Sequence, residues 1–182
     1  MELLKLLSNR PSRIVIDMAV QYVGNDPERF ERIVNYVLSG NPPVPHMAAW
    51  VLTVCCEKNP QLLLPHIDKL IEALPSYYHS GITRMVLRSL MMVQIPDHVK
   101  GLLFEYCMKF YDDKVSPIAV KANAMEIMYN IASTEHELLQ EFELMLEPKI
   151  LSFDKGIKSK ALKIQATIQE NKKKRPKIKG LK

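Results

Sequence analysis

The residues that most often carry catalytic or metal chemistry are spread thinly along this sequence. The histidines fall one to a region, without the helical spacing of a paired metal site. They are His46, His66, His79, His98 and His136. No Cys-x-x-Cys pair occurs among Cys55, Cys56 and Cys107, which we interpret as small core residues. We therefore predict no metal site and no cofactor.

The motifs of covalent and phosphate chemistry are missing as well. The sequence holds no Gly-x-Ser-x-Gly elbow and no Gly-x-x-x-x-Gly-Lys loop, and it has only 6 glycines against 12 prolines. Adjacent acids occur at Asp112-Asp113, and several glutamates cluster between residues 135 and 147. Acid–base catalysis needs a cleft that shifts a pKa, so we interpret these acids as a capped turn and a solvated helix face. The prediction is a protein that is not an enzyme.

The formal charge of the 182-residue chain is +5, but it is unevenly distributed. Residues 171–182 hold seven Lys and Arg residues and no acid, so they carry +7 and leave −2 for the rest. Such an end can contact phosphates, with Lys172, Lys173, Lys174 and Arg175 as the candidate contacts, or it can be a flexible, solubilising extension. Both interpretations stay open.

Proline marks the start of recurrent amphipathic helices, which must position any functional side chain. After Pro27 the apolar residues fall at helical spacing from Phe30 to Leu38, and Asn25 and Asp26 can cap the helix. Similar starts follow at Asn59-Pro60, at Pro96, and near residue 135, where Thr134 and Glu137 fit a capping box. Successive starts are about 33 to 39 residues apart, which is typical of a repeat architecture.

A second type of helix precedes each proline-started one and repeats with nearly the same period. Its pattern of an apolar, a basic or polar, a small and an apolar residue begins at 44, 82, 120 and 157. The small residues Ala48, Ala124 and Ala161 allow close helix packing. We therefore predict stacked helix pairs over 11–39, 44–75, 80–112 and 117–149, a closing helix over 155–170, and a short cap over 1–9.

Two segments resemble HEAT repeats. Val-Lys-x-x-Ala-x-x-Ile from Val120 to Ile127, after Asp112-Asp113, looks like a second helix, and Pro60 to Ile71, with its internal Pro65, looks like a first helix. Armadillo repeats share these motifs. The resemblance implies an all-α fold, a right-handed α-α superhelix of about four to five stacked antiparallel helix pairs. Together with the charge distribution, it predicts a repeat domain of residues 1–170 and a basic, flexible tail over 171–182.

In such solenoids the second helices line the concave face, and here they differ in charge from the first helices. With their caps, the second helices carry ten bases and five acids, whereas the first helices and their loops carry seven bases and fourteen acids. We predict a protein-interaction scaffold whose concave face binds an acidic protein through Arg84, Arg88, Lys121 and Lys158. The alternative is a nucleic-acid-binding protein that uses this basic ladder together with the tail. Neither the partner nor the oligomeric state follows from the sequence.

A weaker alternative concerns Trp50, the single tryptophan. HEAT-type DNA glycosylases, which remove alkylated purines, use Trp and Asp residues in a concave groove. Trp50 lies in the apolar stretch from Ala48 to Leu52, and no second tryptophan is available to sandwich a base. We therefore expect Trp50 to belong to the core between repeats.

The hydropathy of the chain points away from membranes. No uncharged apolar run reaches the ~18 residues of a transmembrane helix, and Glu2 precedes too short an apolar run for a secretory signal. We expect a cytoplasmic protein with no membrane partner.

Overall fold

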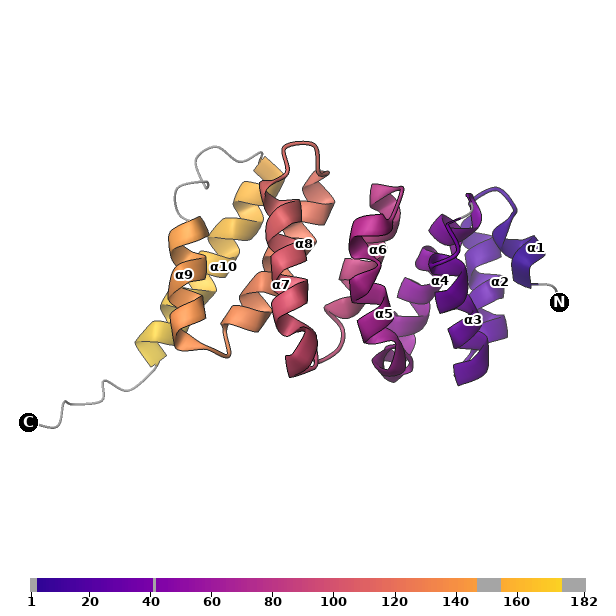
Figure 1. The fold of residues 1–182 in the computed structure, drawn as a ribbon, viewed down its shortest axis with the longest axis horizontal. Coiled ribbons are helices and arrows are strands. Elements are labelled where there is room, and N and C mark those ends of the chain that lie inside the picture. The colour runs from indigo at the N-terminus through magenta and orange to yellow at the C-terminus, as the bar shows by residue number, and fades with distance from the viewer. Residues whose placement is uncertain (1–2, 41, 147–154, 175–182) are drawn as a thin grey trace, which may run out of the picture. The chain divides into compact units, whose positions relative to one another are not determined.

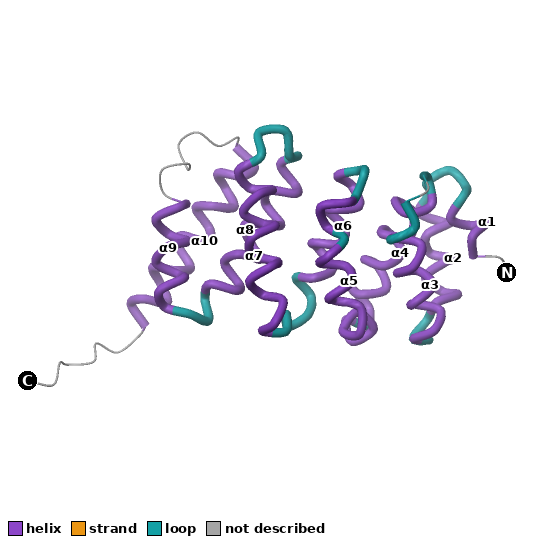
Figure 2. The backbone as a smooth tube through the Cα atoms, viewed as in Figure 1, coloured by secondary structure: helices purple, strands orange, loops and turns teal. Residues whose placement is uncertain are grey.

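The computed structural model describes residues 3–40, 42–146 and 155–174, and these form helices and no strands (Figures 1 and 2). The elements are α1 Leu3–Leu7, α2 Arg13–Val23, α3 Pro27–Val37, α4 Val44–Lys58, the 3₁₀ helix Pro60–His66, α5 Ile67–Glu72, the 3₁₀ turn Leu74–Ser76, α6 Ser80–Leu90, α7 Asp97–Asp112, α8 Ile118–Ala132, α9 His136–Leu146 and α10 Lys155–Lys174. The all-α repeat architecture is thereby confirmed. The chain divides into two compact units, Met1–Ile127 and Met128–Lys182, so that the boundary falls within α8.

Both periodic markers of the sequence coincide with helices. The starts predicted at 27, 60, 96 and about 135 correspond to α3, the 3₁₀ helix at Pro60, α7 and α9. The second pattern, which begins at 44, 82, 120 and 157, lies in α4, α6, α8 and α10. Ala48, Ala124 and Ala161 are fully buried, as close helix packing requires.

The N-terminus of α3 is capped as predicted. The Asp26 carboxylate accepts hydrogen bonds from the backbone N–H groups of Glu28 (3.0 Å) and Arg29 (3.1 Å). Pro27 occupies the first turn, where its missing N–H leaves no bond unmade. The same carboxylate forms an ion pair with the Arg29 side chain at 3.0 Å, so Asp26 fixes the first turn by three contacts.

Two of the other predicted caps are replaced by different contacts. Asn59 makes no capping bond, and its side-chain amide instead donates to the Asn25 side chain at 3.3 Å, which joins equivalent positions of successive repeats. The Thr134 hydroxyl donates back to the Ile131 carbonyl at 2.8 Å, and α9 begins at His136, so Glu135 directly precedes the helix and the capping box predicted with Thr134 and Glu137 is wrong. In both cases the polar side chain bonds to the preceding turn or repeat rather than to the helix that it precedes.

Pro65 divides the helix predicted over residues 60–71. Residues Pro60–His66 form a 3₁₀ helix and only Ile67–Glu72 form an α-helix, α5. Proline has no N–H for an i to i−4 bond and clashes with the preceding turn, which explains the change of helix type at this point.

The core of the first unit is built around α4. This helix packs against α2, α3 and α6, and nearly all its side chains between Val44 and Cys56 are buried. Phe30 and Ile33 of α3 are also fully buried. Because α4 is covered on most of its circumference, the few side chains on its remaining face are the ones that solvent or a ligand can reach.

The second unit contains the end of α8 with α9 and α10. Phe142, Leu146, Ala161 and Ile168 are among its buried residues, and the ring centroids of Tyr129 and Phe142 lie 6.4 Å apart. Glu143 of α9 pairs with Lys172 of α10. Helix α10 includes Asn171–Lys174, so the first four residues of the predicted tail are helical, whereas Arg175 lies outside the described residues.

Candidate binding groove

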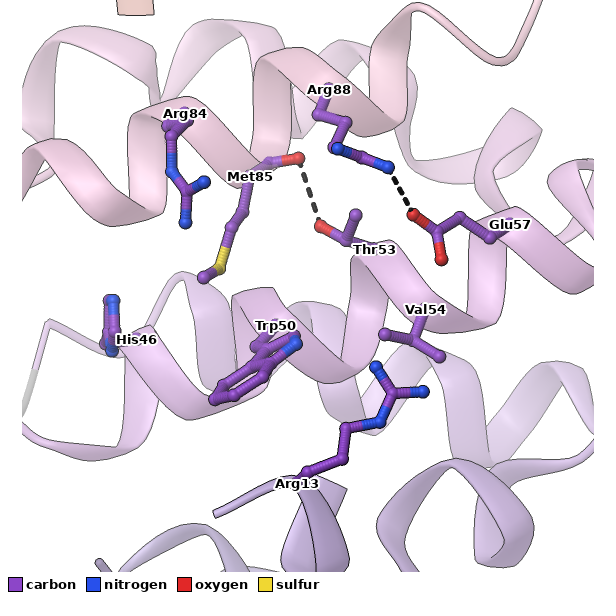
Figure 3. Close-up of a pocket in the computed structure, with 9 residues that line it drawn as sticks. All are labelled: Arg13, His46, Trp50, Thr53, Val54, Glu57, Arg84, Met85 and Arg88. Carbon is purple, nitrogen blue, oxygen red and sulfur yellow. Dashed lines mark hydrogen bonds and ion pairs between the residues drawn. The ribbon is translucent and has the colours of Figure 1, made fainter. Parts of the chain in front are cut away.

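A hollow of about 430 Å³ lies between three helices of the first unit (Figure 3). Arg13 of α2 lines it on one side, and Arg84, Met85 and Arg88 of α6 line it on the other. Helix α4 contributes the residues between them, at positions that share one helix face: His46, Trp50, Thr53, Val54 and Glu57. We call this the Trp50 hollow.

A second hollow, of about 370 Å³, adjoins the first. Its lining residues are Arg84, Arg88, Met91, Met92, Ala119 and Asn123. Arg84 and Arg88 line both hollows, so together they form one groove that extends from α2 across α4 and α6 to α8. The second helices of successive pairs therefore line this groove within the first unit.

Buried hydrogen bonds fix the floor of the groove. The Thr53 hydroxyl can donate to a backbone carbonyl of α4 or to one of α6, the latter being the Met85 carbonyl at 3.1 Å. The same hydroxyl accepts a bond from the Ser89 hydroxyl at 3.1 Å. Ser89 also lies 2.9 Å from the Met85 carbonyl. On the far side, the Asn123 amide donates to the Arg84 carbonyl at 3.0 Å, which ties α8 to α6. These bonds hold the backbone that carries the groove arginines.

The three arginines of the groove differ in their partners. Arg88 forms an ion pair with Glu57 at 2.8 Å, and Arg13 forms one with Asp17 of its own helix at 3.0 Å. The Arg84 guanidinium makes no hydrogen bond or ion pair with the residues that the structure describes, and it is exposed. Arg84 is therefore the cation of this groove whose donors remain available to a ligand.

Trp50 corrects a prediction made from the sequence. It is half-buried and lines the hollow rather than filling the core between repeats. In Figure 3, Arg84 reaches toward α4 from one side and Arg13 from the other, with Trp50 on α4 between them. An aromatic surface flanked by cations thus forms the middle of the hollow.

Two histidines pack together at the edge of the Trp50 hollow. The ring centroids of His46 and His79 lie 4.9 Å apart in an edge-to-face arrangement, and His79 Nδ1 accepts a bond from the Gly81 N–H at 3.0 Å. A Cβ at Gly81 would lie 2.7 Å from His46 Nε2 and 2.8 Å from His79 Nδ1. The absence of a side chain at Gly81 therefore makes room for the histidine pair.

Burial lowers the pKa of His46 below its usual value, and the charges of His79 and Arg84 lower it further. Burial also lowers the pKa of His66, with Lys69 adding to this and Glu31 opposing it. In the pH range between the lowered values and the ordinary value near 6.5, the unfolded chain binds more protons than the folded one. The stability that these histidines confer is thus present above that range and is lost as the pH falls through it.

We accordingly expect the free energy of unfolding to decrease when the pH is lowered from about 7.5 to about 5.5, through the ordinary histidine range. Urea titrations at the two pH values measure this change. The variant with His46→Gln and His66→Gln should show a smaller decrease than the wild type. An equal decrease in both proteins would mean that His46 and His66 do not cause the loss of stability at low pH.

The structure brings together only part of the predicted basic ladder. Arg84 and Arg88 lie one helical turn apart in the groove, but Lys121 of α8 lines neither hollow. The hydrogen bond from Ser116 is the largest cause of the lowered pKa of Asp113, and the charge of Lys121 adds to it. Lys158 belongs to the second unit, where it lines a separate hollow of about 480 Å³ with Lys155 and Lys163.

The predicted tail contacts are placed only in part. Lys172 of α10 is engaged by Glu143, and Lys173 is exposed near the end of the same helix. Lys174 is the last residue of α10.

No helix in the described part of the chain combines the length and apolar character needed to cross a membrane. Across the same residues no three metal-binding side chains gather as a ligand set.

Sequence reasoning missed several groove residues: Arg13, His46, Trp50, Glu57 and Asn123. A signal for those on α4 was present, because His46, Trp50, Thr53 and Glu57 recur at helical spacing as the interruptions of an otherwise apolar helix. Such a polar stripe on a buried helix marks the face that no other helix covers.

Comparison with known proteins gives one match. The family model described as a HEAT repeat domain matches residues 3–168, which is most of the chain. No curated protein and no solved structure matches. The HEAT family is a family of helical repeat scaffolds that generally serve protein interaction and are generally not enzymes. With the repeat model extending over nearly all of its helices, the chain belongs to the HEAT-repeat family.

Proposed function

We propose that this chain is a protein-binding scaffold without catalytic activity and that its groove in the first unit holds an acidic segment of a partner protein. The observation that carries the proposal is the exposed Arg84 at the junction of two hollows, where no residue in the described part of the chain pairs with its guanidinium. A guanidinium binds a carboxylate through two parallel hydrogen bonds, which gives both affinity and direction.

The charges lining the groove favour an anionic occupant. Three arginines face one carboxylate, Glu57, and that carboxylate is already engaged by Arg88. The groove also runs across successive repeats, and an extended chain can use such a surface along its length. An acidic peptide therefore matches the groove in both charge and form.

A random octapeptide library offered to the full chain tests this proposal. The bound peptides should be enriched in Asp and Glu and depleted in Lys and Arg at about 0.15 M salt, where weak surface attraction is largely screened. A bound pool with the composition of the input library, or one enriched in basic residues, would refute the proposal.

Nucleic-acid binding is a second candidate, favoured by the basic face of α10. Lys155, Lys158 and Lys163 line one hollow of the second unit, and this helix leads directly into the basic end of the chain. If these lysines and the end bind phosphates, affinity for DNA or RNA should fall steeply with salt, by a log–log slope of about −0.7 to −0.9 per contact. No retardation of either nucleic acid at low salt would exclude this candidate.

A further inference from the structure

This inference rests on the proposed function and names what the Trp50 hollow recognises. We propose that it binds one two-residue element of the acidic segment: an aromatic side chain, which packs on the indole of Trp50, next to an Asp or Glu, whose carboxylate binds Arg84. The remainder of the groove then holds the chain on either side of this element.

The form of the hollow suits an aromatic side chain. Its volume of about 430 Å³ lies within the ~300–1,000 Å³ typical of sites that enclose a small ligand. Trp50 forms its middle, with the apolar side chains of Val54 and Met85 beside the indole (Figure 3). Aromatic rings gain affinity from edge-to-face or offset packing beyond the area that they bury.

The cations of the hollow assign the carboxylate to Arg84. Arg88 is held by Glu57, so a ligand that used Arg88 would have to compete with a carboxylate already in place. Arg84 has no such competitor among the described residues, and it reaches toward α4 in Figure 3. Arg13 faces α4 from the opposite side and is likewise held by a carboxylate, that of Asp17 in its own helix.

Glu57 and the lone tryptophan favour a peptide over a nucleic-acid strand in this hollow. A strand carries a charge at every phosphate along its length, whereas a peptide can place a carboxylate at Arg84 and an uncharged side chain beside the Arg88–Glu57 ion pair. Proteins that bind single strands use several aromatic side chains on which successive bases stack. The chain has a single tryptophan, which serves one aromatic side chain of a ligand.

His46 gives the complex a dependence on pH. The groups that face it are His79 and Arg84 from the α6 side, and Arg13 lines the same hollow from α2. A bound carboxylate at Arg84 offsets the positive charge that disfavours the protonated imidazole. Binding is then accompanied by proton uptake, and affinity should rise as the pH falls through the histidine range.

Trp50 fluorescence provides a specific readout, because it is the only tryptophan and it lies in the proposed site. The probes are three capped heptapeptides, Gly-Ser-Glu-Phe-Glu-Ser-Gly, its Phe-to-Ala analogue and its double Glu-to-Gln analogue. We expect saturable changes in fluorescence, with affinity for each analogue lower by about tenfold. This corresponds to ~1.4 kcal/mol for each analogue, which is within the range for an aromatic contact and just below the range for a hydrogen bond to a charged group.

Variants of Trp50 separate recognition from folding, with the same peptides carrying a fluorescent label. Trp50→Ala should abolish the preference for Phe over Ala and keep the preference for Glu over Gln, while Trp50→Phe should retain both. Tyr36→Ala, which removes an aromatic side chain from α3 outside the groove, is the matched control and should bind as the wild type does.

The outcomes distinguish this inference from the proposed function. Acidic peptides that bind without a preference for Phe and without a change in Trp50 fluorescence would overturn the inference and leave the scaffold proposal intact. If no acidic peptide binds, from either the library or the probe set, both are overturned. Oligothymidylate that changes Trp50 fluorescence and displaces the peptides would overturn the inference in favour of a nucleic-acid site.

Discussion

Reversing Arg84 and Arg88 together to glutamate should lower the affinity of the chain for acidic peptides by about a hundredfold. Each hydrogen bond to a charged group is worth ~1.5–3 kcal/mol, and ~1.4 kcal/mol corresponds to a tenfold change in affinity. The double reversal removes the guanidinium donors of Arg84, breaks the pair that neutralises Glu57, and adds two negative charges at the junction of the hollows. Anisotropy of a labelled acidic peptide measures the loss.

A matched control separates this local effect from a change in total charge. Arg32→Glu with Lys114→Glu changes the net charge by the same amount, but Arg32 lies on α3 and Lys114 in the loop that follows α7, and neither lines the groove. All four side chains belong to exposed residues, so both double variants should fold. An equal loss of binding in the two double variants would mean that the total charge of the chain, and not the groove, attracts the acidic peptide.

Replacing Phe30 with alanine should lower the free energy of unfolding by ~3–5 kcal/mol, the range for removing a large buried aromatic side chain. Phe30 is 0% exposed in the core of the first unit, and its ring centroid lies 5.8 Å from that of His66. The truncation leaves a cavity where α3 meets the 3₁₀ helix at Pro60, two elements that pack together. Urea unfolding followed by circular dichroism measures the change.

Ile14→Ala is the control for this substitution, because Ile14 is 73% exposed on α2. Exposed positions of this kind change stability by ~0.5 kcal/mol or less. A loss of less than ~1 kcal/mol for Phe30→Ala would mean that α3 is not packed in the core as described.

The repeat architecture could be predicted because local signals and long-range packing agree. Asp26 and Pro27 specify a helix start through contacts within one turn, and the apolar residues that follow them are the ones buried in α3. The alanines of the second pattern are buried for the same periodic reason. Such features depend on neighbours within a few residues or on the repeat period, and both are visible in a sequence.

The groove could be predicted only in part. Arg84 and Arg88 follow from helical spacing, whereas the apolar stretch from Ala48 to Leu52 predicts a core position for Trp50 that the structure does not show. The spacing of His46, Thr53 and Glu57 marks the uncovered side of α4, but whether the Trp50 indole lies in the hollow or under a neighbouring helix depends on the angles at which α2 and α6 cross α4, and the sequence does not state these angles. The Arg88–Glu57 pair joins residues 31 positions apart, so the difference between Arg88, which is paired, and Arg84, which has no ion-pair partner among the described residues, emerges only in three dimensions.

The most direct test of the groove is a charge exchange between protein and peptide. The wild type and the Arg84→Glu variant are each titrated with the Glu-Phe-Glu peptide and with its Lys-Phe-Lys counterpart. If the carboxylate of the ligand meets residue 84, the wild type prefers the acidic peptide and the variant prefers the basic one, each by about tenfold or more. A variant that keeps the wild-type preference for the acidic peptide would contradict the account, because Arg84 would then not be the residue that selects the ligand.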